Sequence, residues 1–554
     1  MKFRRIAPLV AGAAVAALLV SGCAAGGGDD NAAGDGAVLT VGMPNGTQTD
    51  NQSPFATGSS ALSLGYAFVI YEPLMMVNRA MPSEAPKPWL AEKVEWNSDY
   101  TQAVITPRSG VKWSDGEDFT ADDIAFSIQL RKDNEAINTE ALPYGDITSD
   151  GSTVTVAFTA PQFVNQAKLD DLLMVPEHIW KDIKDPATDP NKKPVGTGPY
   201  TLESWTPQAA TVVANPDYWG GKPAAPEIRY SSYNDNNALT TALTTGEAQW
   251  GWTFIADYEN VYIAKDPENH HQYAAAGLGI DALFLNNETK PFDDLAFRQA
   301  LNMVIDRQQL VDVATSGVNP ALTNVTGLPL PAGEAYLSSE YKSKDYKVDV
   351  AGAKKLLTDA GYTYDGDKLV DPDGTPVAFT LTNPAGWNDY LTALDIIKTA
   401  AATIGAVAEV QPANVDGWFA DIIPPGDFQA SLHWTDSGST PYDMYSDIFN
   451  GSQYVPLGDA ANWNFGRFQN EESTAAFATY ASTSDDAERT AAMDTIQRVF
   501  VDEVPAIAIW ARPSTAQYST KNYVGWPSED DPYNSPQPTH QNAAEIVMKL
   551  KPSS

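Results

Sequence analysis

The amino-acid sequence predicts a mixed α/β protein organised in two or three lobes. Amphipathic helical patterns alternate with short β-like apolar runs, and no repeat period links them. A chain of 554 residues is also longer than one hydrophobic core usually organises. The 39 glycines and 39 prolines are scattered, so they separate elements of structure and form no low-complexity block.

Helices are expected where a capping residue precedes apolar residues one turn apart. The first begins at Thr120, which forms a capping box with Asp123. Asp293 and Asp349 are expected to cap two more, and Gly361 to end the second of these. The expected apolar faces are Ile124 and Ile128; Phe297, Leu301, Val304 and Ile305; Ala353, Leu356 and Leu357; and Met493, Ile496 and Phe500.

Strands are expected in short runs rich in β-branched and other apolar residues. These runs cover residues 38–41, 153–158, 282–285 and 506–510. A hairpin is expected within residues 365–381, because Asp365-Gly366 and Asp373-Gly374 both lie beside short apolar runs.

The N-terminal residues have the pattern of a lipoprotein signal peptide. A short basic leader precedes an apolar stretch over residues 6–20 that is too short to span a bilayer. The stretch ends in Val-Ser-Gly-Cys, which resembles a lipobox, and Cys23 is the single cysteine of the chain. We therefore expect a signal peptide over 1–22, a lipid on Cys23 and a flexible tether over 23–37. An ordinary secretory cleavage beside an incidental cysteine is the alternative.

The formal net charge of −36 limits the partners of the chain. Nucleic acid is excluded as a partner, because phosphate binding needs a basic surface. The acidic excess is expected to keep the protein soluble. With 14 tryptophans and 24 tyrosines, some aromatic rings are expected outside the core.

No pattern in the sequence predicts a catalytic residue, a metal or a cofactor. A zinc-protease HExxH, a GxSxG elbow, a phosphate-binding loop and a CxxC pair are all missing from the printed sequence. His270 and His271 are adjacent, so they point apart and suit no shared metal ion. His433, Asp436 and Ser437 lie close in sequence, but triads are assembled from separate segments.

Several stretches along the chain together carry a family pattern. They are RSGVKWSDGEDFTADDI over 108–124, GTGPY over 196–200 with NPDYW over 215–219, LNN over 285–287 with FRQAL over 297–301, and the helical segment 353–362. In combination these stretches resemble the family 5 extracellular solute-binding proteins, which are dipeptide and oligopeptide receptors of ATP-driven importers.

The resemblance implies a two-lobe, hinged, periplasmic-binding-protein-like α/β fold with an additional smaller subdomain. Carried onto this chain, the first lobe takes 38–70, 195–281 and 506–554, the subdomain 71–194 and the second lobe 282–505. It further implies a monomer outside the cytoplasm that encloses a solute between its lobes and delivers it to a membrane permease. A secreted, lipid-anchored glycosidase is the competing class, because the 71 acidic residues offer many possible carboxylate pairs.

The resemblance also suggests where the ligand binds. Peptide-binding members place an aspartate shortly after a tryptophan, where it meets the α-ammonium of the peptide. Here Trp434 matches, and Asp436 lies one position before Ser437, which occupies the place of that aspartate in some peptide binders. The expected ligand-binding residues are Trp434, Asp436, Trp252, Trp387, Trp418, Asn286 and Tyr66.

Two further segments, 250–267 and 382–389, are similar to a branch of the family that binds cello-oligosaccharides. Tryptophan rings make apolar platforms for the C–H faces of sugars, and nearby polar side chains satisfy the hydroxyl groups. The sequence therefore favours an oligosaccharide ligand over an oligopeptide.

Overall fold

The computed structural model describes residues 37–56, 58–414 and 417–553. The predicted signal peptide, Cys23 and nearly all of the predicted tether lie outside the described residues, so the lipid anchor stays a prediction. Within the described ranges, every helix is too short or too polar to cross a membrane.

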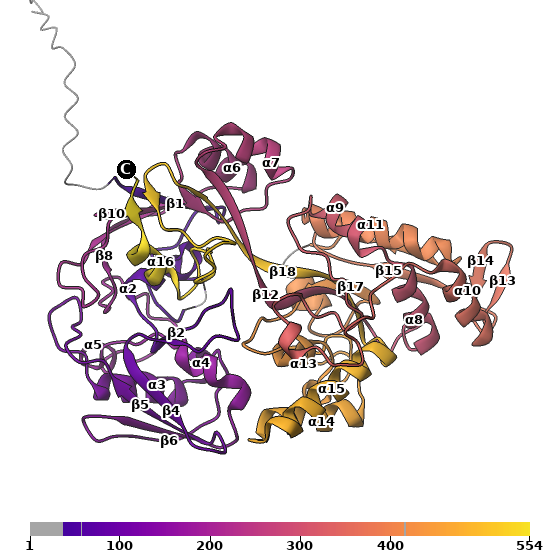
Figure 1. Ribbon diagram of the computed structural model, residues 1–554, viewed down its shortest axis with the longest axis horizontal. Helices are drawn as coiled ribbons and strands as arrows, with labels where there is room; N and C mark the ends of the chain where they lie inside the picture. The colour runs from indigo at the N-terminus through magenta and orange to yellow at the C-terminus, as the bar shows by residue number, and fades with distance from the viewer. Residues whose placement is uncertain (1–36, 57, 415–416, 554) are drawn as a thin grey trace, which may run out of the picture. The chain divides into compact units, whose positions relative to one another are not determined.

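A ten-stranded sheet links distant parts of the described chain, in the order β16-β15-β17-β12-β18-β11-β1-β10-β9-β8. Its centre is formed by two long antiparallel strands, β12 (His270–Leu285) and β18 (Ala506–Ser519), which pair from His270 and Ser519 to Phe284 and Ala506. The ladder is irregular between Ala276 and Ile280. Both groups of strands flank this pair, so β12 and β18 are shared by the two lobes (Figure 1).

The first lobe lies on the β11–β8 side of the sheet. Its core combines Val41 and Tyr230 with Ile546, so the end of the chain packs against its beginning. The strands are β1 (Leu39–Met43), β8 (Tyr200–Thr206), β9 (Ala209–Ala214), β10 (Glu227–Ser232) and β11 (Trp250–Gly251). The helices around them are α1 (Ser60–Leu64), α2 (Ala67–Ile70), α6 (Asn236–Thr245), α7 (Tyr258–Val261) and α16 (Ala543–Lys549), with a short ladder of β19 (Tyr523–Val524) and β20 (Lys551–Pro552).

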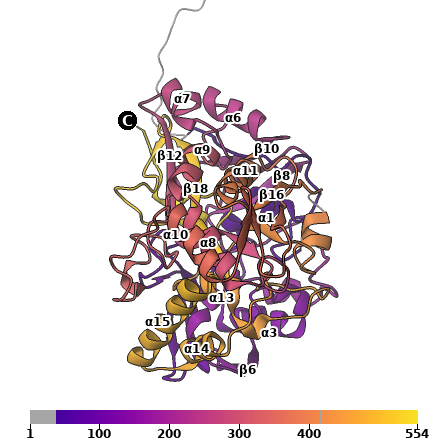
Figure 2. The same ribbon diagram turned by 90° about the vertical axis from the view of Figure 1, so that its right-hand side faces the viewer.

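The second lobe has a hydrophobic core on each face of the sheet, as the two-residue period of a strand requires. Along β12, Leu283 and Leu285 enter one core, while Ala282 and Phe284 enter the other. Helices α9 and α11 lie on one side and α13, α14 and α15 on the other in both views (Figure 1, Figure 2). The strands are β15 (Ala378–Leu381), β16 (Val407–Val410) and β17 (Ala430–Trp434); the helices are α8 (Leu295–Val304), α9 (Arg307–Ala314), α10 (Val350–Asp359), α11 (Asn388–Thr403), α13 (Tyr442–Phe449), α14 (Glu471–Ser482) and α15 (Asp486–Glu503).

A smaller four-stranded antiparallel sheet, in the order β4-β5-β7-β6, carries its own core with helix α3 (Ala121–Asp133). The predicted capping box is confirmed: the backbone N–H of Thr120 donates to Asp123 Oδ2 at 2.9 Å. The remaining elements of this region are β2 (Met75–Met76), β3 (Lys87–Pro88), β4 (Ala91–Trp96), β5 (Gln102–Pro107), β6 (Tyr144–Ser149), β7 (Val154–Phe158), α4 (Gln166–Asp170) and α5 (Glu177–Trp180).

The other predicted elements are present, with corrected ends. The cap of α8 is Asp294 and not Asp293, because the Asp294 carboxylate accepts from Ala296 N at 2.8 Å. Asp349 caps α10 as predicted, and Gly361 follows its end with a φ of +94°. The hairpin is confirmed: β13 (Thr363–Asp365) pairs with β14 (Lys368–Val370) across the first turn, and Val370 forms an antiparallel bridge with Pro376 across the second. The following strand, β15, then joins the large sheet.

Glu72 is a fully buried carboxyl group between α2 and β2. Its oxygens accept hydrogen bonds from Trp89 Nε1 at 2.7 Å, Tyr218 OH at 2.7 Å and Trp219 Nε1 at 3.0 Å. Burial raises the pKa of Glu72 from 4.5 to about 7, although these donors oppose the shift. Because folding raises this pKa, the stabilisation is present below about pH 4.5 and is lost as the pH rises through about 7.

We expect Glu72 to make the protein less stable at pH 8 than at pH 5 by about 2.5 kcal/mol, because part of the linkage effect of this shift is already lost at pH 5, above the unfolded pKa. The Glu72→Gln variant should show a flatter dependence of the melting temperature on pH. Differential scanning calorimetry from pH 5 to pH 8 measures it, with Glu203→Gln at an exposed strand position as the control. An unchanged pH slope in Glu72→Gln would contradict this account.

Candidate ligand-binding site

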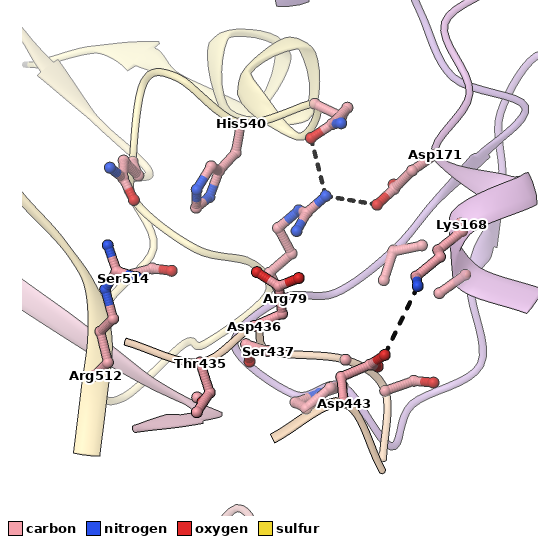
Figure 3. Close-up of a pocket in the computed structure, with 18 of the residues that line it drawn as sticks. Arg79, Lys168, Asp171, Thr435, Asp436, Ser437, Asp443, Arg512, Ser514 and His540 are labelled. Atoms are coloured by element: carbon pink, nitrogen blue, oxygen red, sulfur yellow. Dashed lines mark hydrogen bonds and ion pairs between the residues drawn. The ribbon is translucent and has the colours of Figure 1, made fainter. Parts of the chain in front are cut away.

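A cavity of about 420 Å³ is bounded by the subdomain, by β12 and β18, and by the loop after β17 (Figure 3). This volume lies within the range of small-molecule sites. Both signs of charge line the cavity, and among the described lining residues Trp252 is the one tryptophan. The charged lining residues are Arg79, Lys168, Arg512, Glu140, Asp171, Asp436 and Asp443.

The floor of the cavity is formed by the backbone pairing around Ile280 on β12. Ile280 pairs with Ala511 of β18 on one side, and on the other its carbonyl accepts a hydrogen bond from Thr435 N at 2.9 Å. Arg512 follows Ala511 on β18, and Asp436 follows Thr435 in the loop after β17. The two charged residues therefore lie on opposite sides of β12. The next floor residue on β12 is Gly279, which has no side chain to fill the space between the two charges.

Asp436 and its neighbour Ser437 are exposed residues that both line the cavity. Ser437 Oγ accepts a hydrogen bond from Leu278 N at 2.9 Å, so this side chain fixes the loop onto β12. The backbone N–H of Asp436 donates to Asp447 Oδ2 at 2.7 Å. Its carboxylate accepts no hydrogen bond from any described residue. Desolvation by the surrounding lobes raises the pKa of Asp436, while Lys168, Arg512 and Arg79 oppose this shift.

Two of the cavity's cations are already paired with carboxylates. A guanidinium nitrogen of Arg79 lies 2.6 Å from Asp171 Oδ2 and donates to Gln541 Oε1 at 2.9 Å. Lys168 Nζ lies 3.7 Å from Asp443 Oδ1, which joins the subdomain to the second lobe. Burial raises the pKa of Asp443, and the negative charge of Asp436 adds to the shift.

Arg512 and His540 complete the wall from the C-terminal part of the chain. The Arg512 guanidinium stacks over the Trp434 ring at 5.0 Å and forms no ion pair with a described residue. His540 Nδ1 lies 3.2 Å from Ser535 Oγ. Desolvation, with Arg79 and Arg512 nearby, lowers the pKa of His540 to about 3, so its imidazole is neutral at physiological pH.

The predicted ligand-binding residues fall into two groups. Asp436 and Trp252 line the cavity, and Trp434 is half-buried beneath Arg512. The other four make contacts within the lobes. Trp387 is half-buried and packs at 5.2 Å against Trp418, which is fully buried. Three side chains donate hydrogen bonds inside the lobes: Trp418 Nε1 to Ser431 Oγ at 3.1 Å, Asn286 Nδ2 to the carbonyls of Gly426 and Phe428 at 2.9 Å each, and Tyr66 OH to Gln52 Oε1.

His433 lies apart from its sequence neighbours Asp436 and Ser437. It is stacked between Trp418 at 5.3 Å and Trp434 at 4.1 Å, whereas Asp436 and Ser437 both line the cavity, where Ser437 also bonds Leu278. The sequence reasoning missed Arg79, Lys168, Arg512 and His540, which come from separate segments without a shared motif. Their one signal is chemical type, since arginine, lysine and histidine are scarce in this acidic chain.

A hinged α/β body that encloses a charged cavity beside the strands shared by its lobes is the architecture of a solute-binding receptor. The model of the bacterial extracellular solute-binding proteins, family 5, matches residues 85–455. The chain belongs to this family.

The chain is similar to the glutathione-binding protein GsiB of Salmonella typhimurium, with 27% identity over 482 residues, 84% of this chain and 88% of the relative. It is 28% identical to the oligopeptide-binding protein AppA of Bacillus subtilis over 382 residues, 66% of this chain and 68% of the relative. In fold it is similar to the periplasmic oligopeptide-binding protein of a Thermotoga maritima ABC transporter, with 23% identity, a TM-score of 0.81 and coverage of 93% and 99% of the two chains. The mannohexaose-bound form of that protein gives a TM-score of 0.76 at 23% identity, covering 93% and 98%.

Proposed function

We propose that this chain is the lipid-anchored receptor of an ABC importer for a short peptide-like solute with a free ammonium group. Cys23 carries the lipid, the folded body lies outside the cytoplasm as a monomer, and the closed receptor docks on a membrane permease. The division of the chain into two lobes and a subdomain belongs to the same proposal. We infer the ammonium group of the ligand from Asp436, whose carboxylate faces the cavity without a described hydrogen-bond partner.

The unpaired carboxylate matters because a ligand that fills the cavity displaces water from it, and a desolvated anion is costly without a cation. An ammonium group of the ligand would supply that cation and several hydrogen-bond donors. Sugars carry no such charge. The seven charged side chains of the lining therefore support a charged or zwitterionic solute, even though the sequence alone favours an oligosaccharide. The similarity to GsiB, a glutathione-binding protein, and to AppA, an oligopeptide-binding protein, supports the same choice.

Capture proceeds by a shift between open and closed forms. Residues from the subdomain and from the second lobe line one cavity. A ligand therefore contacts the subdomain and the second lobe at once only in the closed form. The protein already has contacts that favour closure. Phe163 of the subdomain lies 5.9 Å from Tyr480 and 3.8 Å beneath the Arg489 guanidinium, both in the second lobe.

An oligosaccharide is the second candidate, and the aromatic cluster beside Arg512 favours it. Phe419 is 47% exposed and packs against Trp387 at 6.0 Å and Trp434 at 6.1 Å. An exposed aromatic surface of this kind suits the flat face of a sugar ring. The mannohexaose-bound structure of a protein with the same fold keeps this candidate open to experiment.

A thermal-shift comparison of a tripeptide library with cello-oligosaccharides tests the proposal. A specific ligand at 100 times its dissociation constant stabilises the native state by about 2.7 kcal/mol. We expect the tripeptide library to raise the melting temperature and the cello-oligosaccharides to leave it unchanged. A rise with cello-oligosaccharides alone would replace the peptide proposal by the second candidate.

The same samples distinguish a receptor from a hydrolase. After overnight incubation, chromatography should recover the peptides and sugars intact, because the receptor binds without turnover. Stoichiometric excess of cleaved product would assign the chain to the competing class of secreted hydrolases.

A further inference from the structure

We propose that the first lobe has a surface that rests on an anionic lipid membrane, at the ladder of β19 and β20 beside the start of β1. We call this surface the basal face and define it by Val38, Lys521, Val524, Lys549 and Lys551. The inference rests on the lipid anchor of the proposed function and goes beyond it, because it assigns a contact between the folded body and the membrane itself.

The end of the chain lies beside the point where the described residues begin. In the short ladder, Tyr523 of β19 pairs with Pro552 of β20, and the Tyr523 hydroxyl donates to the carbonyl of Ala37, just before β1. Figure 1 shows the C-terminus close to β1 and β10. A flexible tether over 23–36, as the sequence predicts, would hold this ladder about 20 Å from a lipid on Cys23. The basal face is therefore the part of the body nearest to the proposed anchor.

The three lysines of the basal face are exposed, and none of them forms an ion pair with a described residue. These lysines are Lys521, Lys549 and Lys551. The acidic residues 529–531 follow β19 closely but pair with none of the three. Because the chain has 71 acidic and only 35 basic residues, three unpaired lysines in one short ladder make this end of the body distinct in charge.

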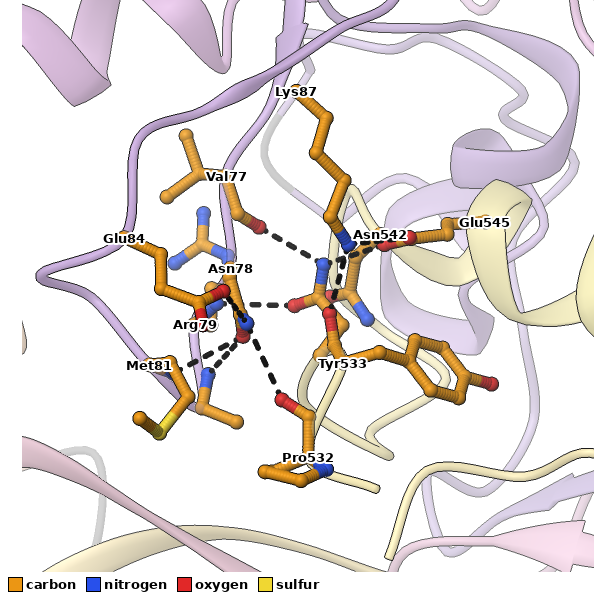
Figure 4. Close-up of polar contacts among 12 residues, drawn as sticks. Val77, Asn78, Arg79, Met81, Glu84, Lys87, Pro532, Tyr533, Asn542 and Glu545 are labelled. Atoms are coloured by element: carbon orange, nitrogen blue, oxygen red, sulfur yellow. Dashed lines mark hydrogen bonds and ion pairs between the residues drawn. The ribbon is translucent and has the colours of Figure 1, made fainter.

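Lys549 remains unpaired because its natural partner is occupied elsewhere. Glu545 lies one turn earlier on α16, the spacing at which Glu and Lys usually pair. Its buried carboxylate instead accepts from Asn534 Nδ2 at 2.9 Å and lies 2.7 Å from Lys87 Nζ of the subdomain (Figure 4). The Lys549 ammonium lies 4.1 Å from the centre of the Tyr533 ring. This cation–π contact holds the ammonium in place and leaves its charge unneutralised.

Two exposed valines lie among the lysines. Val524 is 40% exposed and pairs directly with Lys551 across the ladder, so the two side chains share one face. Val38 is 43% exposed and directly follows Ala37. Aliphatic side chains beside lysines suit the headgroup region of a membrane, where the apolar parts enter the boundary with the acyl chains and the ammonium groups meet the phosphates.

The charge of the rest of the protein makes this orientation selective. A body with a formal net charge of −36 is repelled by an anionic surface, so only a basic face can approach it. The attraction of lysines to such a surface acts within a Debye length, about 8 Å at physiological ionic strength. The tether makes the contact intramolecular and so raises the local concentration of the basal face at the membrane. Because all five residues belong to the first lobe, the contact leaves the second lobe free to open and close.

Hydrogen exchange on nanodiscs tests the basal face. Cys23 is the single cysteine, so a maleimide lipid attaches the protein from Cys23 onward at that residue, whether or not cells add a lipid there. We expect backbone amides within 519–525 and 548–553 to exchange at least threefold more slowly on nanodiscs that contain phosphatidylglycerol than on nanodiscs of phosphatidylcholine alone. The difference should vanish at about 1 M salt, where the Debye length falls to about 3 Å.

Two variants with the same change of net charge locate the contact. The first replaces the three lysines of the basal face by glutamine and should lose the protection. The second should keep it, because it changes three exposed lysines of the second lobe: Lys342→Gln, Lys368→Gln and Lys398→Gln.

Each other outcome overturns a defined part of the account. Equal exchange on both kinds of nanodisc would overturn the basal face and leave the proposed receptor and its anchor standing. Protection that survives in the first variant, or is lost equally in both, would overturn the assignment to these lysines. Mass spectrometry of the protein from cell membranes tests the anchor separately, and an unmodified Cys23 would overturn that part of the proposed function and the membrane contact with it.

Discussion

Replacing Asp436 by asparagine is expected to weaken tripeptide binding by at least thirtyfold while the protein remains folded. Removing one partner of a desolvated, hydrogen-bonded charge pair costs about 2–5 kcal/mol, and each 1.4 kcal/mol is about tenfold in affinity. Asparagine keeps the shape of the side chain, so the loss measures the charge. Isothermal titration calorimetry with the tripeptide that wild type retains most strongly gives the ratio of dissociation constants.

The stability of the same variant provides an internal check. The charge of Asp436 helps to raise the pKa of Asp443 and Asp447, because the three carboxyl groups lie close together. Neutralising Asp436 relieves this repulsion, so the melting temperature of the Asp436→Asn variant should be equal to or above that of wild type. Asp182→Asn, at an exposed position outside the cavity lining, serves as the matched control. Wild-type affinity in Asp436→Asn would remove Asp436 from the binding site.

Replacing Trp418 by alanine is expected to destabilise the second lobe by about 3–5 kcal/mol, the usual cost of truncating a buried tryptophan. The Trp418 side chain is fully buried, stacks on His433 at 5.3 Å and donates a hydrogen bond to Ser431. The large cavity left behind explains the size of the effect. Differential scanning calorimetry measures the loss, and calorimetric titration of the folded variant should give an affinity within threefold of wild type.

Trp434→Ala is the matched control, because Trp434 belongs to the same aromatic cluster but stacks on Arg512 of the cavity. This variant should bind at least tenfold more weakly and unfold at nearly the wild-type temperature. If Trp418→Ala instead lost affinity at unchanged stability, Trp418 would be a ligand platform, as the sequence alone predicts.

Local chemistry made much of the fold predictable. The capping box at Thr120 and the cap at Asp349 follow from hydrogen bonds that form within a few residues, and the structure confirms both. The runs 282–285 and 506–510 were recognisable as strands because both faces are buried. Their extension into strands of 16 and 14 residues was not, since the outer halves contain polar residues and glycine and are stabilised by pairing across more than two hundred positions.

The site was predictable only where a family segment marks it. That segment pointed to Trp434 and Asp436, and the structure places Asp436 in the cavity wall. Asn286 and Tyr66 show the opposite case, because a polar or aromatic side chain looks the same in sequence whether it binds a ligand or a carbonyl group inside a lobe. The tertiary fold alone brings together Arg79, Arg512 and His540, so no local sequence spacing predicts them.

Native mass spectrometry of the wild-type protein after incubation with a mixed pool tests the central claim most directly. The pool contains free tripeptides and cello-oligosaccharides at equal concentration, and the mass of the retained species identifies the ligand class. We predict one intact tripeptide bound per protein chain. Retention of a cello-oligosaccharide, or of cleaved fragments in place of an intact peptide, would contradict the account.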